Sequence, residues 1–438
     1  MKDLVIIGGG VSGIGSALLA KKNGFNVFVS DKGGISDQGL LLKNNIQFEE
    51  GSHDDKRILQ ANLVIKSPGI PNNTPIIKDL KCRDIPVISE IEFAYTYTKA
   101  KIIAVTGTNG KTTTTLLIGH ILKKAGYDVL VAGNIGTSFA GSICNRDYDY
   151  IVLELSSFQL DDTCSFKAHV SIILNISPDH LERYGYSFDN YISSKLKILN
   201  NQNDDDFVIY NYDDSHIRDR IRSEATLIPF SLNHRFESYG AFYQSNKINI
   251  NIKKNNMTIE ELSLQGKHNL YNSMAAAAAG RVLEVKDFVI RQSLLDFENI
   301  EHRLEHVLNV HGIEFINDSK ATNINSVWYA LESMTKDIIW IAGGVDKGND
   351  YNELSELVRE KVKSIICIGE SKSNLHEAFK GDIDNIVDVN TMSEAVFRSY
   401  EIASQGDVVL LSPACASFDM FENYEHRGIE FKKYVRSL

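Results

Sequence analysis

The chain has few cysteines and no long apolar run. Its 438 residues include five cysteines, which lie far apart and form no Cys-x-x-Cys pair, so the sequence offers neither a disulfide framework nor a cysteine-based zinc or redox motif. The apolar run at residues 4–7 stops at three glycines, and no other run approaches the ~20 apolar residues of a membrane helix. We therefore expect reduced thiols, a cytoplasmic location and no membrane span.

Basic charge is also scarce. The 46 Lys and Arg residues are outnumbered by 57 Asp and Glu residues, which gives a formal net charge of -11. The basic residues are scattered and form no stripe that could neutralise a phosphate backbone, so nucleic acid is not an expected partner. With 43% hydrophobic residues, the chain has enough apolar surface for full cores. A chain of this length predicts about three domains.

Short β-branched runs alternate with helical patterns, which predicts an α/β protein with parallel sheets and crossover helices. We expect an N-terminal Rossmann-like domain over residues 1–96, a central P-loop ATPase sheet over 97–300 and a C-terminal Rossmann-like domain over 301–438. The expected strands are residues 3–7, 26–30, 62–66, 85–89, 102–106, 150–154, 170–175, 207–210, 313–318, 338–344, 364–369 and 407–412. Helices are expected over 13–24 and over the alanine-rich segment 272–283.

A first glycine turn, GGGVSGIG, follows the strand expected at residues 3–7. Gly8, Gly10 and Gly13 match G-x-G-x-x-G, and Asp31 ends the next expected strand, where a dinucleotide-binding protein places its ribose ligand. Taken alone, this pattern favours an NAD-dependent oxidoreductase. Glycines required for close packing, or a site for another phosphorylated ligand, explain the same pattern.

A second glycine turn, AVTGTNGKTTTT, is more specific. Gly110, Lys111 and Thr112 supply backbone N–H groups, a cation for the terminal phosphates and a hydroxyl for Mg²⁺. The pattern departs from the usual phosphate loop because Val105 stands at the first glycine position and Gly107 follows two residues later. A glycine turn before a threonine-rich helix is the alternative, but it leaves the lysine unexplained.

Candidate metal ligands follow neighbouring strands. Glu154 ends the run YIVLE, and Asp179 and His180 follow the strand expected at 170–175, so they should reach one edge of a parallel sheet. A solvated glutamate and a lone surface histidine are the alternatives. From the residues alone, Lys195 is a surface lysine on an amphipathic helix.

Six stretches together resemble the Mur ligase family, the ATP-dependent amide-forming enzymes of peptidoglycan precursor synthesis. In chain order they are GTNGKTTTT, ELSSFQL, NISPDHLERYG, GKHNLYN, EHRLE and NDSKATN, and they span nearly the whole chain. SPG at residues 67–69 and the C-terminal SPACASFDMFENYEHRG resemble the members that add D-glutamate to UDP-N-acetylmuramoyl-L-alanine through an acyl phosphate. The resemblance implies that the first glycine turn holds a UDP-sugar and the second holds ATP with Mg²⁺.

The resemblance also implies roles for individual residues at the ATP site. Lys195 matches a lysine that is carbamylated in the family and then holds metal, and Asn272 matches a residue near adenine. Asn269, like Asn272, stands where it could cap the alanine-rich helix. The expected ATP-binding residues are Gly107, Thr108, Asn109, Gly110, Lys111, Thr112, Thr113, Asn272, Arg303 and Asp318. The expected metal ligands are Thr112, Glu154, His180 and Lys195, and the expected catalytic residues are Lys111, His180, Lys195 and Lys320.

The other two substrates are assigned by the same resemblance. The expected UDP-sugar residues are Val11, Ser12, Asp31, Ser67, Pro68, Gly69 and Asn134. The expected D-glutamate residues are Thr322, Lys347, Ser417 and Tyr424. The position of Tyr424 often holds Phe in the family, which leaves the side-chain carboxylate contact open. An ATP site shared between two domains implies domain closure.

Four alternatives remain open from the sequence. They are a Mur ligase that adds L-alanine, a folylpolyglutamate synthetase, an NAD-dependent oxidoreductase and a non-catalytic ATP-binding regulator. The second lacks an N-terminal Rossmann-like part, and the third leaves the phosphate loop without a purpose. We expect small-molecule partners only and a monomer.

Overall fold

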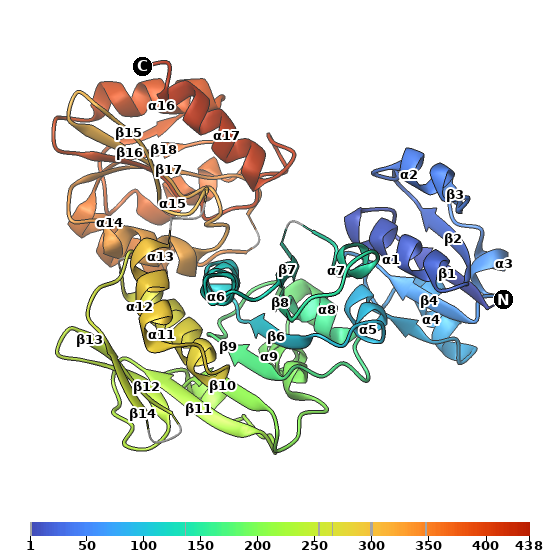
Figure 1. The fold of residues 1–438 in the computed structure, drawn as a ribbon. Coiled ribbons are helices and arrows are strands. Elements are labelled where there is room, and N and C mark those ends of the chain that lie inside the picture. Colours follow the sequence, from blue (N-terminus) through green and yellow to red (C-terminus); the bar gives the residue numbers. More distant parts are fainter. Residues whose placement is uncertain (1, 136, 253–254, 265, 298–300, 347) are drawn as a thin grey trace. The chain divides into compact units, whose positions relative to one another are not determined.

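The computed structural model describes residues 2–135, 137–252, 255–264, 266–297, 301–346 and 348–438. The α/β fold expected from the sequence is confirmed, and each of three sheets corresponds to one expected domain (Figure 1). The chain forms two compact units. The first comprises Met1–Ser263 and Asn269–Phe297, and the second comprises Leu264–His268 and Glu298–Leu438.

The first sheet has five parallel strands in the order β3-β2-β1-β4-β5. This order reverses direction at β1, so the glycine turn after β1 lies at the switch point of the sheet. The strands are β1 (Asp3–Ile7), β2 (Asn26–Asp31), β3 (Gln47–Glu50), β4 (Leu63–Lys66) and β5 (Val87–Ile88). The helices are α1 (Val11–Lys22), α2 (Gln38–Lys43), α3 (Asp55–Ile58), α4 (Pro75–Cys82) and α5 (Glu90–Tyr95).

The second sheet has nine strands in the order β14-β13-β12-β11-β10-β9-β6-β8-β7. Its parallel strands are β6 (Lys101–Thr106), β7 (Val129–Gly133), β8 (Tyr150–Glu154), β9 (Val170–Ile173), β10 (Phe207–Asn211), β11 (Thr226–Ser231) and β12 (Gly240–Gln244). The helices are α6 (Lys111–Lys124), α7 (Phe139–Ile143), α8 (Ser157–Asp161), α9 (Phe188–Leu196), α10 (Ser215–Arg218), α11 (Lys267–Val282), α12 (Asp287–Asp296) and the 3₁₀ helices η1 (Leu181–Tyr184) and η2 (Lys197–Leu199).

An antiparallel meander ends this sheet. Strand β12 pairs with β13 (Lys247–Ile252), which pairs with β14 (Asn255–Ile259). Burial alternates residue by residue along β13, so its isoleucines face the core and its polar residues face solvent. This meander is not among the elements expected from the sequence. The alternation of polar and apolar residues in KININI is the pattern that indicates a half-buried strand here.

The third sheet lies in the second unit and has the order β15-β16-β20-β17-β18-β19. Strand β15 is antiparallel and the others are parallel, so the expected doubly wound sheet carries one antiparallel edge. The strands are β15 (Glu305–Val310), β16 (Ile313–Asn317), β17 (Ile338–Ala342), β18 (Val362–Cys367), β19 (Ile386–Asp388) and β20 (Val408–Leu411). The helices are α13 (Ile324–Ser333), α14 (Ser355–Lys361), α15 (Lys372–Phe379), α16 (Met392–Ile402), α17 (Tyr424–Val435) and the 3₁₀ helix η3 (Tyr351–Leu354).

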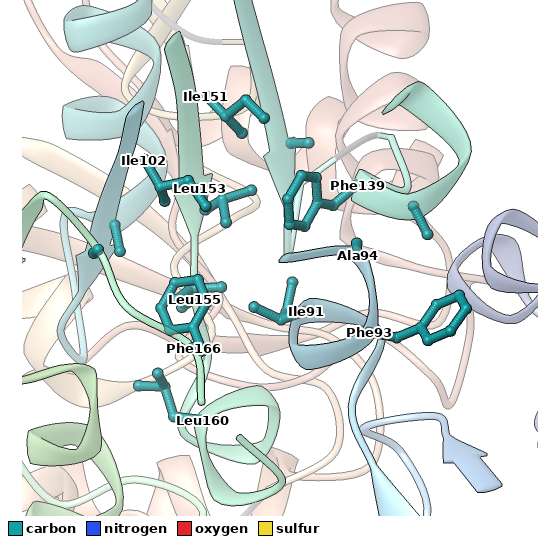
Figure 2. Packing of buried hydrophobic residues seen from close by; sticks show 14 of the residues in the cluster. Ile91, Phe93, Ala94, Ile102, Phe139, Ile151, Leu153, Leu155, Leu160 and Phe166 are labelled. Carbon is teal, nitrogen blue, oxygen red and sulfur yellow. The ribbon is translucent and has the colours of Figure 1, made fainter. Parts of the chain in front are cut away.

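Helix α5 packs the first domain against the central sheet. Ile91 and Phe93 of α5 belong to the same buried cluster as Phe139 of α7 and Leu153 of β8, and all four side chains are labelled in Figure 2. These side chains are almost fully buried, and each contributes about 1.5–3 kcal/mol of transfer free energy. The two sheets of the first unit are therefore joined by a shared apolar core.

The alanine-rich helix begins earlier than the sequence indicated. Helix α11 starts at Lys267, so Asn269 and Asn272 lie inside its first turns and do not precede it as caps. Both side chains are buried, because tertiary contacts here outweigh the preference of Asn for helix ends. Among the described residues, no helix is long and apolar enough to cross a bilayer.

Candidate active site

The second glycine turn joins β6 to α6 as a phosphate loop. Gly107 and Gly110 have φ angles of +153° and +84°, and a Cβ at Gly110 would lie 2.3 Å from Oδ1 of Asn272. Glycine is therefore required at Gly110 by both backbone conformation and space. The N–H groups of the first turn of α6 follow directly, which creates a positive helix end suited to phosphate.

Asn175, directly after β9, fixes the shape of this loop. Its Oδ1 accepts a hydrogen bond of 2.8 Å from the backbone N–H of Asn109, and its Nδ2 donates one of 3.0 Å to the carbonyl of Asn109. Its own carbonyl accepts from the N–H of Thr108 at 2.8 Å. Asn175 is the first residue of the stretch NISPDH, and its role at the loop is not predicted from the sequence.

Two lysines meet at one carbonyl of the loop. The ammonium of Lys111 donates hydrogen bonds of 2.8 Å to the carbonyls of Gly107 and Thr108. Lys195, from α9, donates one of 2.8 Å to the same Gly107 carbonyl. The structure thus brings the expected catalytic Lys195 to the phosphate loop, which its position in the sequence alone did not indicate.

Glu154 lies beside the loop at the end of β8. Its side chain is buried, and its two oxygens accept hydrogen bonds from the hydroxyl of Thr112 (2.6 Å) and from Nδ2 of Asn134 (2.9 Å). A buried carboxylate and a hydroxyl are hard oxygen donors that suit Mg²⁺. Asn134, which is expected at the UDP-sugar, contacts this candidate metal ligand.

Lys195 is almost completely buried, and its environment disfavours the ammonium form. Burial lowers its pKa well below the usual value and the nearby charge of Lys111 lowers it further, while Asp179 and Glu154 act in the opposite direction. The Nζ atom also lies 4.8 Å from the centre of the Tyr191 ring. Burial and the charge of Lys111 therefore shift the balance of Lys195 from the ammonium towards the neutral amine.

His180 caps η1 with a left-handed backbone, at φ +52°. Its ring lies edge-on to Phe158, with centroids 5.3 Å apart, and its nitrogens are 3.7 Å from Asp179 and 3.8 Å from Glu182. The side chain is about one-third exposed. The His180 ring is therefore held by Phe158, Asp179 and Glu182 while part of it stays exposed to a ligand.

The first glycine turn is closely packed. A Cβ at Gly13 would lie 1.9 Å from the carbonyl of Gly8, and one at Gly8 would lie 2.5 Å from Cβ of Ser67. Asp31 accepts hydrogen bonds from the N–H groups of Gly9 (2.5 Å) and Gly33 (2.6 Å). Ser67 is thus brought to the turn, and Asp31 holds the turn in shape.

Other expected sugar-nucleotide residues lie around this turn. Val11 is 59% exposed at the start of α1. The next residue, Ser12, is a hydrogen-bond neighbour of Glu90. Burial raises the pKa of the Glu90 carboxyl group, and the hydroxyls of Ser12 and Ser138 offset part of this rise. Glu90 accepts hydrogen bonds from Ser138 (2.5 Å) and from the N–H of Ala140 (3.1 Å), so α5 links the first glycine turn to α7.

Arg183 connects the SPG segment to the central sheet. Its guanidinium donates hydrogen bonds to the carbonyls of Gly69 (3.0 Å) and Pro68 (3.1 Å), and it lies over the ring of Phe158 at 4.3 Å. Phe158 in turn contacts His180. The SPG segment and the region of His180 are therefore brought together through one arginine that sequence analysis did not single out.

In the second unit, Asp318 lies just after β16 and is buried. It accepts hydrogen bonds from the N–H of Leu304 (3.3 Å) and the hydroxyl of Ser412 (2.9 Å). Burial raises its pKa to about 7, although the positive charge of Arg303 opposes this shift. The structure thus places the expected Arg303 and Asp318 near each other.

Arg427 organises the loops around the expected D-glutamate residues. Its buried guanidinium donates to the hydroxyl and carbonyl of Ser319 and to the carbonyl of Cys415. Ser319 also donates to the carbonyl of Tyr424, and the ammonium of Lys320 lies 5.1 Å from the Tyr424 ring centre. The structural role of Arg427 is not predicted from the sequence. It lies in the stretch NYEHRGIE, and nothing in this pattern indicates that the arginine is buried.

The remaining expected D-glutamate residues lie on nearby segments of this unit. Thr322 is partly buried two residues before α13, and Ser417 is buried after β20. Lys347 lies outside the described residues. The bounds predicted for the three domains, and every residue role, remain predictions.

Three family models match consecutive parts of the chain. The Mur ligase MurD-like N-terminal domain matches residues 2–89, the Mur ligase middle domain matches 105–280, and the Mur ligase glutamate ligase domain matches 302–415. Together they cover all three sheets. The chain belongs to the Mur ligase family, and this membership implies the use of ATP.

Curated relatives match over the full length. The UDP-N-acetylmuramoylalanine--D-glutamate ligases of Christiangramia forsetii and Bacteroides thetaiotaomicron are 48% and 49% identical to this chain, with 100% of each chain covered. That of Porphyromonas gingivalis is 47% identical, with 100% of this chain and 99% of the relative covered.

Solved structures share the fold at lower identity. The UDP-N-acetylmuramate-alanine ligase of Thermotoga maritima has a TM-score of 0.64 at 20% identity over 100% of both chains. The MurF ligase of Thermotoga maritima, in complex with ADP, has a TM-score of 0.60 at 16% identity over 87% of this chain and 91% of that one. At these identities, the likeness supports the fold alone.

Proposed function

We propose that this protein adds D-glutamate to UDP-N-acetylmuramoyl-L-alanine in peptidoglycan precursor synthesis, with ATP as the energy source. The observation that carries the proposal is the full-length similarity, at 46–49% identity, to ligases named for this reaction. The oxidoreductase alternative has no comparable support, since the first glycine turn belongs to a Mur ligase N-terminal domain.

The chemistry requires activation of a carboxylate. ATP phosphorylates the carboxylate of the L-alanyl residue, and the nitrogen of D-glutamate then attacks the acyl carbonyl and displaces phosphate. Both reactants are anionic, so cations and N–H groups must offset their charge. Lys111 and the first turn of α6 supply these at the phosphate loop, and Lys320 is the corresponding candidate in the second unit.

Oxygen donors in the first unit fit Mg²⁺. Thr112 and Glu154 are joined by a hydrogen bond of 2.6 Å and buried together, and His180 is the candidate ligand for a second ion. Mg²⁺ would neutralise charge on the transferring phosphoryl group. Asn109, Thr108 and Thr113 would complete the phosphate contacts.

Lys195 is proposed to act as a carbamate. Its depressed pKa favours the neutral amine, which adds to CO₂ with loss of one proton and becomes a carboxylate-bearing side chain. The carbamate carries a negative charge beside the ammonium of Lys111 and supplies a further hard oxygen ligand. The hydrogen bond of Lys195 to the Gly107 carbonyl supports a role at the phosphate loop.

The remaining assignments follow the three expected domains, residues 1–96, 97–300 and 301–438. The UDP-sugar would bind the first glycine turn and SPG, while Arg303 and Asp318 would reach the nucleoside and Asn272 the adenine. Thr322, Lys347, Ser417 and Tyr424 would hold D-glutamate. We further propose a monomer in the cytoplasm, where ATP and UDP-sugars are available.

Phosphate release by the purified protein tests the proposal. The assay contains ATP, Mg²⁺ and UDP-N-acetylmuramoyl-L-alanine, with D-glutamate, L-glutamate or no amino acid. Release that depends on D-glutamate supports the reaction and its stereochemistry. Release only with UDP-N-acetylmuramate and L-alanine would instead assign the chain to the preceding ligation, and no release with either pair would favour an ATP-binding regulator.

A further inference from the structure

A group of three potential metal ligands lies at the edge of the third sheet, in the second unit. Cys367 is the last residue of β18 and Asp388 is the last residue of β19, and the two are paired in parallel register. Paired residues of adjacent strands project from the same face of a sheet. His376, from α15, contributes the third side chain.

The ligand atoms of these residues are close together. One ligand atom from each of Cys367, His376 and Asp388 lies within 4.8 Å of the other two, and Nε2 of His376 is 2.9 Å from Oδ1 of Asp388. The Cys367 side chain is fully buried, whereas the other two are about half exposed. Cys367 forms no disulfide in the described part of the chain.

We propose that Cys367, His376 and Asp388 form a binding site for a borderline transition-metal ion, of which Zn²⁺ is the expected occupant. A thiolate, an imidazole and a carboxylate are the ligand types that Zn²⁺ takes in proteins, at about 2.3, 2.0 and 2.1 Å. A tetrahedral site of these bond lengths separates its ligands by about 3.5 Å, so side-chain adjustments of about 1 Å suffice. Water would occupy the fourth position.

The charge and chemistry of this site separate it from the Mg²⁺ ligands of the ATP site. Thiolate and carboxylate together balance the charge of one divalent ion, and sulfur and nitrogen ligands select against Mg²⁺, which prefers oxygen. The inference therefore does not depend on the proposed ligase activity. The three residues belong to β18, β19 and α15, and these elements contain none of the expected substrate residues.

The expected consequence is a more stable sheet edge. Strand β19 has only three residues, Ile386–Asp388, and it pairs on one side only, with β18. A metal ion would join β18, β19 and α15 through one residue each. Because the metal would bind the folded state preferentially, it would stabilise that state by mass action.

Cobalt(II) titration of the full-length protein tests the site directly. Chelator-treated protein in excess Mg²⁺ is titrated with Co²⁺, and the thiolate-to-cobalt charge-transfer absorption is recorded in the near ultraviolet. We expect about one equivalent of Co²⁺ to produce the band and Zn²⁺ to abolish it. Cys367→Ser should lose the band, whereas the matched control Cys144→Ser, which alters a buried cysteine of the first unit, should keep it.

Two further variants keep the proposal testable if Cys367→Ser fails to fold. His376→Gln and Asp388→Asn alter half-exposed side chains, and each should weaken Co²⁺ binding at least about tenfold while far-ultraviolet circular dichroism stays unchanged. Absence of a charge-transfer band in the wild type would overturn the proposal and leave His376 and Asp388 as a surface ion pair. So would a band that survives Cys367→Ser, or unchanged affinity in both folded variants.

Discussion

The hydroxyl of Thr112 donates a 2.6 Å hydrogen bond to Oε2 of Glu154, although the two residues are 42 positions apart in the chain. The contact forms because β6 and β8 are adjacent parallel strands, with Val105 paired with Glu154, so the phosphate loop after β6 faces the end of β8. Both side chains are buried. The arrangement brings together a hydroxyl and a carboxylate, which are ligand types that suit a divalent cation.

Removing the Thr112 hydroxyl should weaken the response to Mg²⁺. If Thr112 binds Mg²⁺ as proposed, the Mg²⁺ concentration for half-maximal phosphate release should rise by about 10- to 100-fold in Thr112→Val, because Glu154 loses its partner and the ion loses a ligand. Thr112→Ser should retain most of the response. The measurement is a Mg²⁺ titration of ATP-dependent phosphate release at saturating substrates.

Thr115→Val is the matched control for this experiment. Thr115 lies on the same helix, and its buried hydroxyl has no hydrogen-bond partner among the described residues, so an isosteric apolar replacement should be close to neutral. If Thr112→Val and Thr115→Val showed the same Mg²⁺ dependence, the assignment of Thr112 as a ligand would be wrong.

Gly110→Ala should abolish productive ATP binding without unfolding the protein. The backbone of Gly110 is left-handed, and the new Cβ would lie 2.3 Å from Oδ1 of Asn272, so the phosphate loop or α11 must shift. Gly126→Ala is the control, since Gly126 has a similar φ of +95° with open space around its Cβ position. Both variants carry about 1–2 kcal/mol of backbone strain, but only Gly110→Ala should lose binding of an ATP analogue in calorimetry. Equal affinities would show that the contact with Asn272 does not matter.

The sequence predicted the phosphate loop and many of the parallel strands, because both depend on local patterns, but it missed β3, β7, β19 and every strand from β11 to β15. Runs such as DLVII and YIVLE coincide with β1 and β8, and Gly110 and Lys111 begin α6 as expected. Helix α11 was placed too late because Asn269 and Asn272 resemble cap residues in isolation. Their burial inside the helix depends on partners far away in the chain, such as Thr114.

The sequence did not predict the roles of residues whose contacts lie far away in the chain. Asn175 fixes the phosphate loop across 66 positions, and Arg427 joins loops more than 100 positions away. Neither carries a local signal, since a single Asn or Arg is usually exposed. Lys195 shows the same limit, because its burial follows from tertiary packing and its helical pattern alone indicates a surface lysine.

Lys195→Ala should lose turnover, and small carboxylates should restore part of it. If Lys195 carries a carbamate, the alanine variant leaves space in which formate or acetate can supply the missing oxygen ligand. Lys197→Ala is the control, because Lys197 is partly exposed and pairs with Asp161 at 2.8 Å. We expect phosphate release to recover with added acetate only in Lys195→Ala. No recovery in a variant of native circular dichroism would count against the carbamate.

Arg183→Ala should affect the sugar nucleotide more than ATP. The side chain donates two hydrogen bonds to the carbonyls of Pro68 and Gly69, so its loss should release the SPG segment from the central sheet. We expect KM for UDP-N-acetylmuramoyl-L-alanine to rise about tenfold, equivalent to ~1.4 kcal/mol, with little change in KM for ATP. The exposed Arg220, paired with Asp189 at 3.1 Å, provides the control Arg220→Ala. A parallel rise in both KM values would indicate general disruption of the first unit.

Asp318 should make the second unit less stable as pH rises from about 4 to 7. Burial raises its folded-state pKa to about 7 from an ordinary value of 3.8, so in this window the folded state retains a proton that the unfolded state releases. The free energy of unfolding then falls with rising pH, by at most about 1.4 kcal/mol per pH unit from this group. Below pH 4, Asp318 is protonated in both states and adds no pH dependence to the free energy of unfolding. Above pH 7, it is ionised in both states, and the free energy of unfolding falls no further because of this group.

Asp318→Asn should remove the fall in the free energy of unfolding that Asp318 causes. Between pH 4 and 7, the stability of the variant should therefore rise relative to that of the wild type. Above pH 7, the difference between the two proteins should stay constant. Urea unfolding followed by tryptophan fluorescence is a suitable measurement, because both tryptophans of the chain, Trp328 and Trp340, lie in the second unit. Trp340 donates a hydrogen bond of 2.7 Å to the carbonyl of Ser412, whose hydroxyl bonds to Asp318, so it reports on the same region. The exposed Asp384 gives the control Asp384→Asn, which should follow the wild-type curve. If Asp318→Asn also followed that curve at every pH, the carboxyl group would not retain its proton on folding.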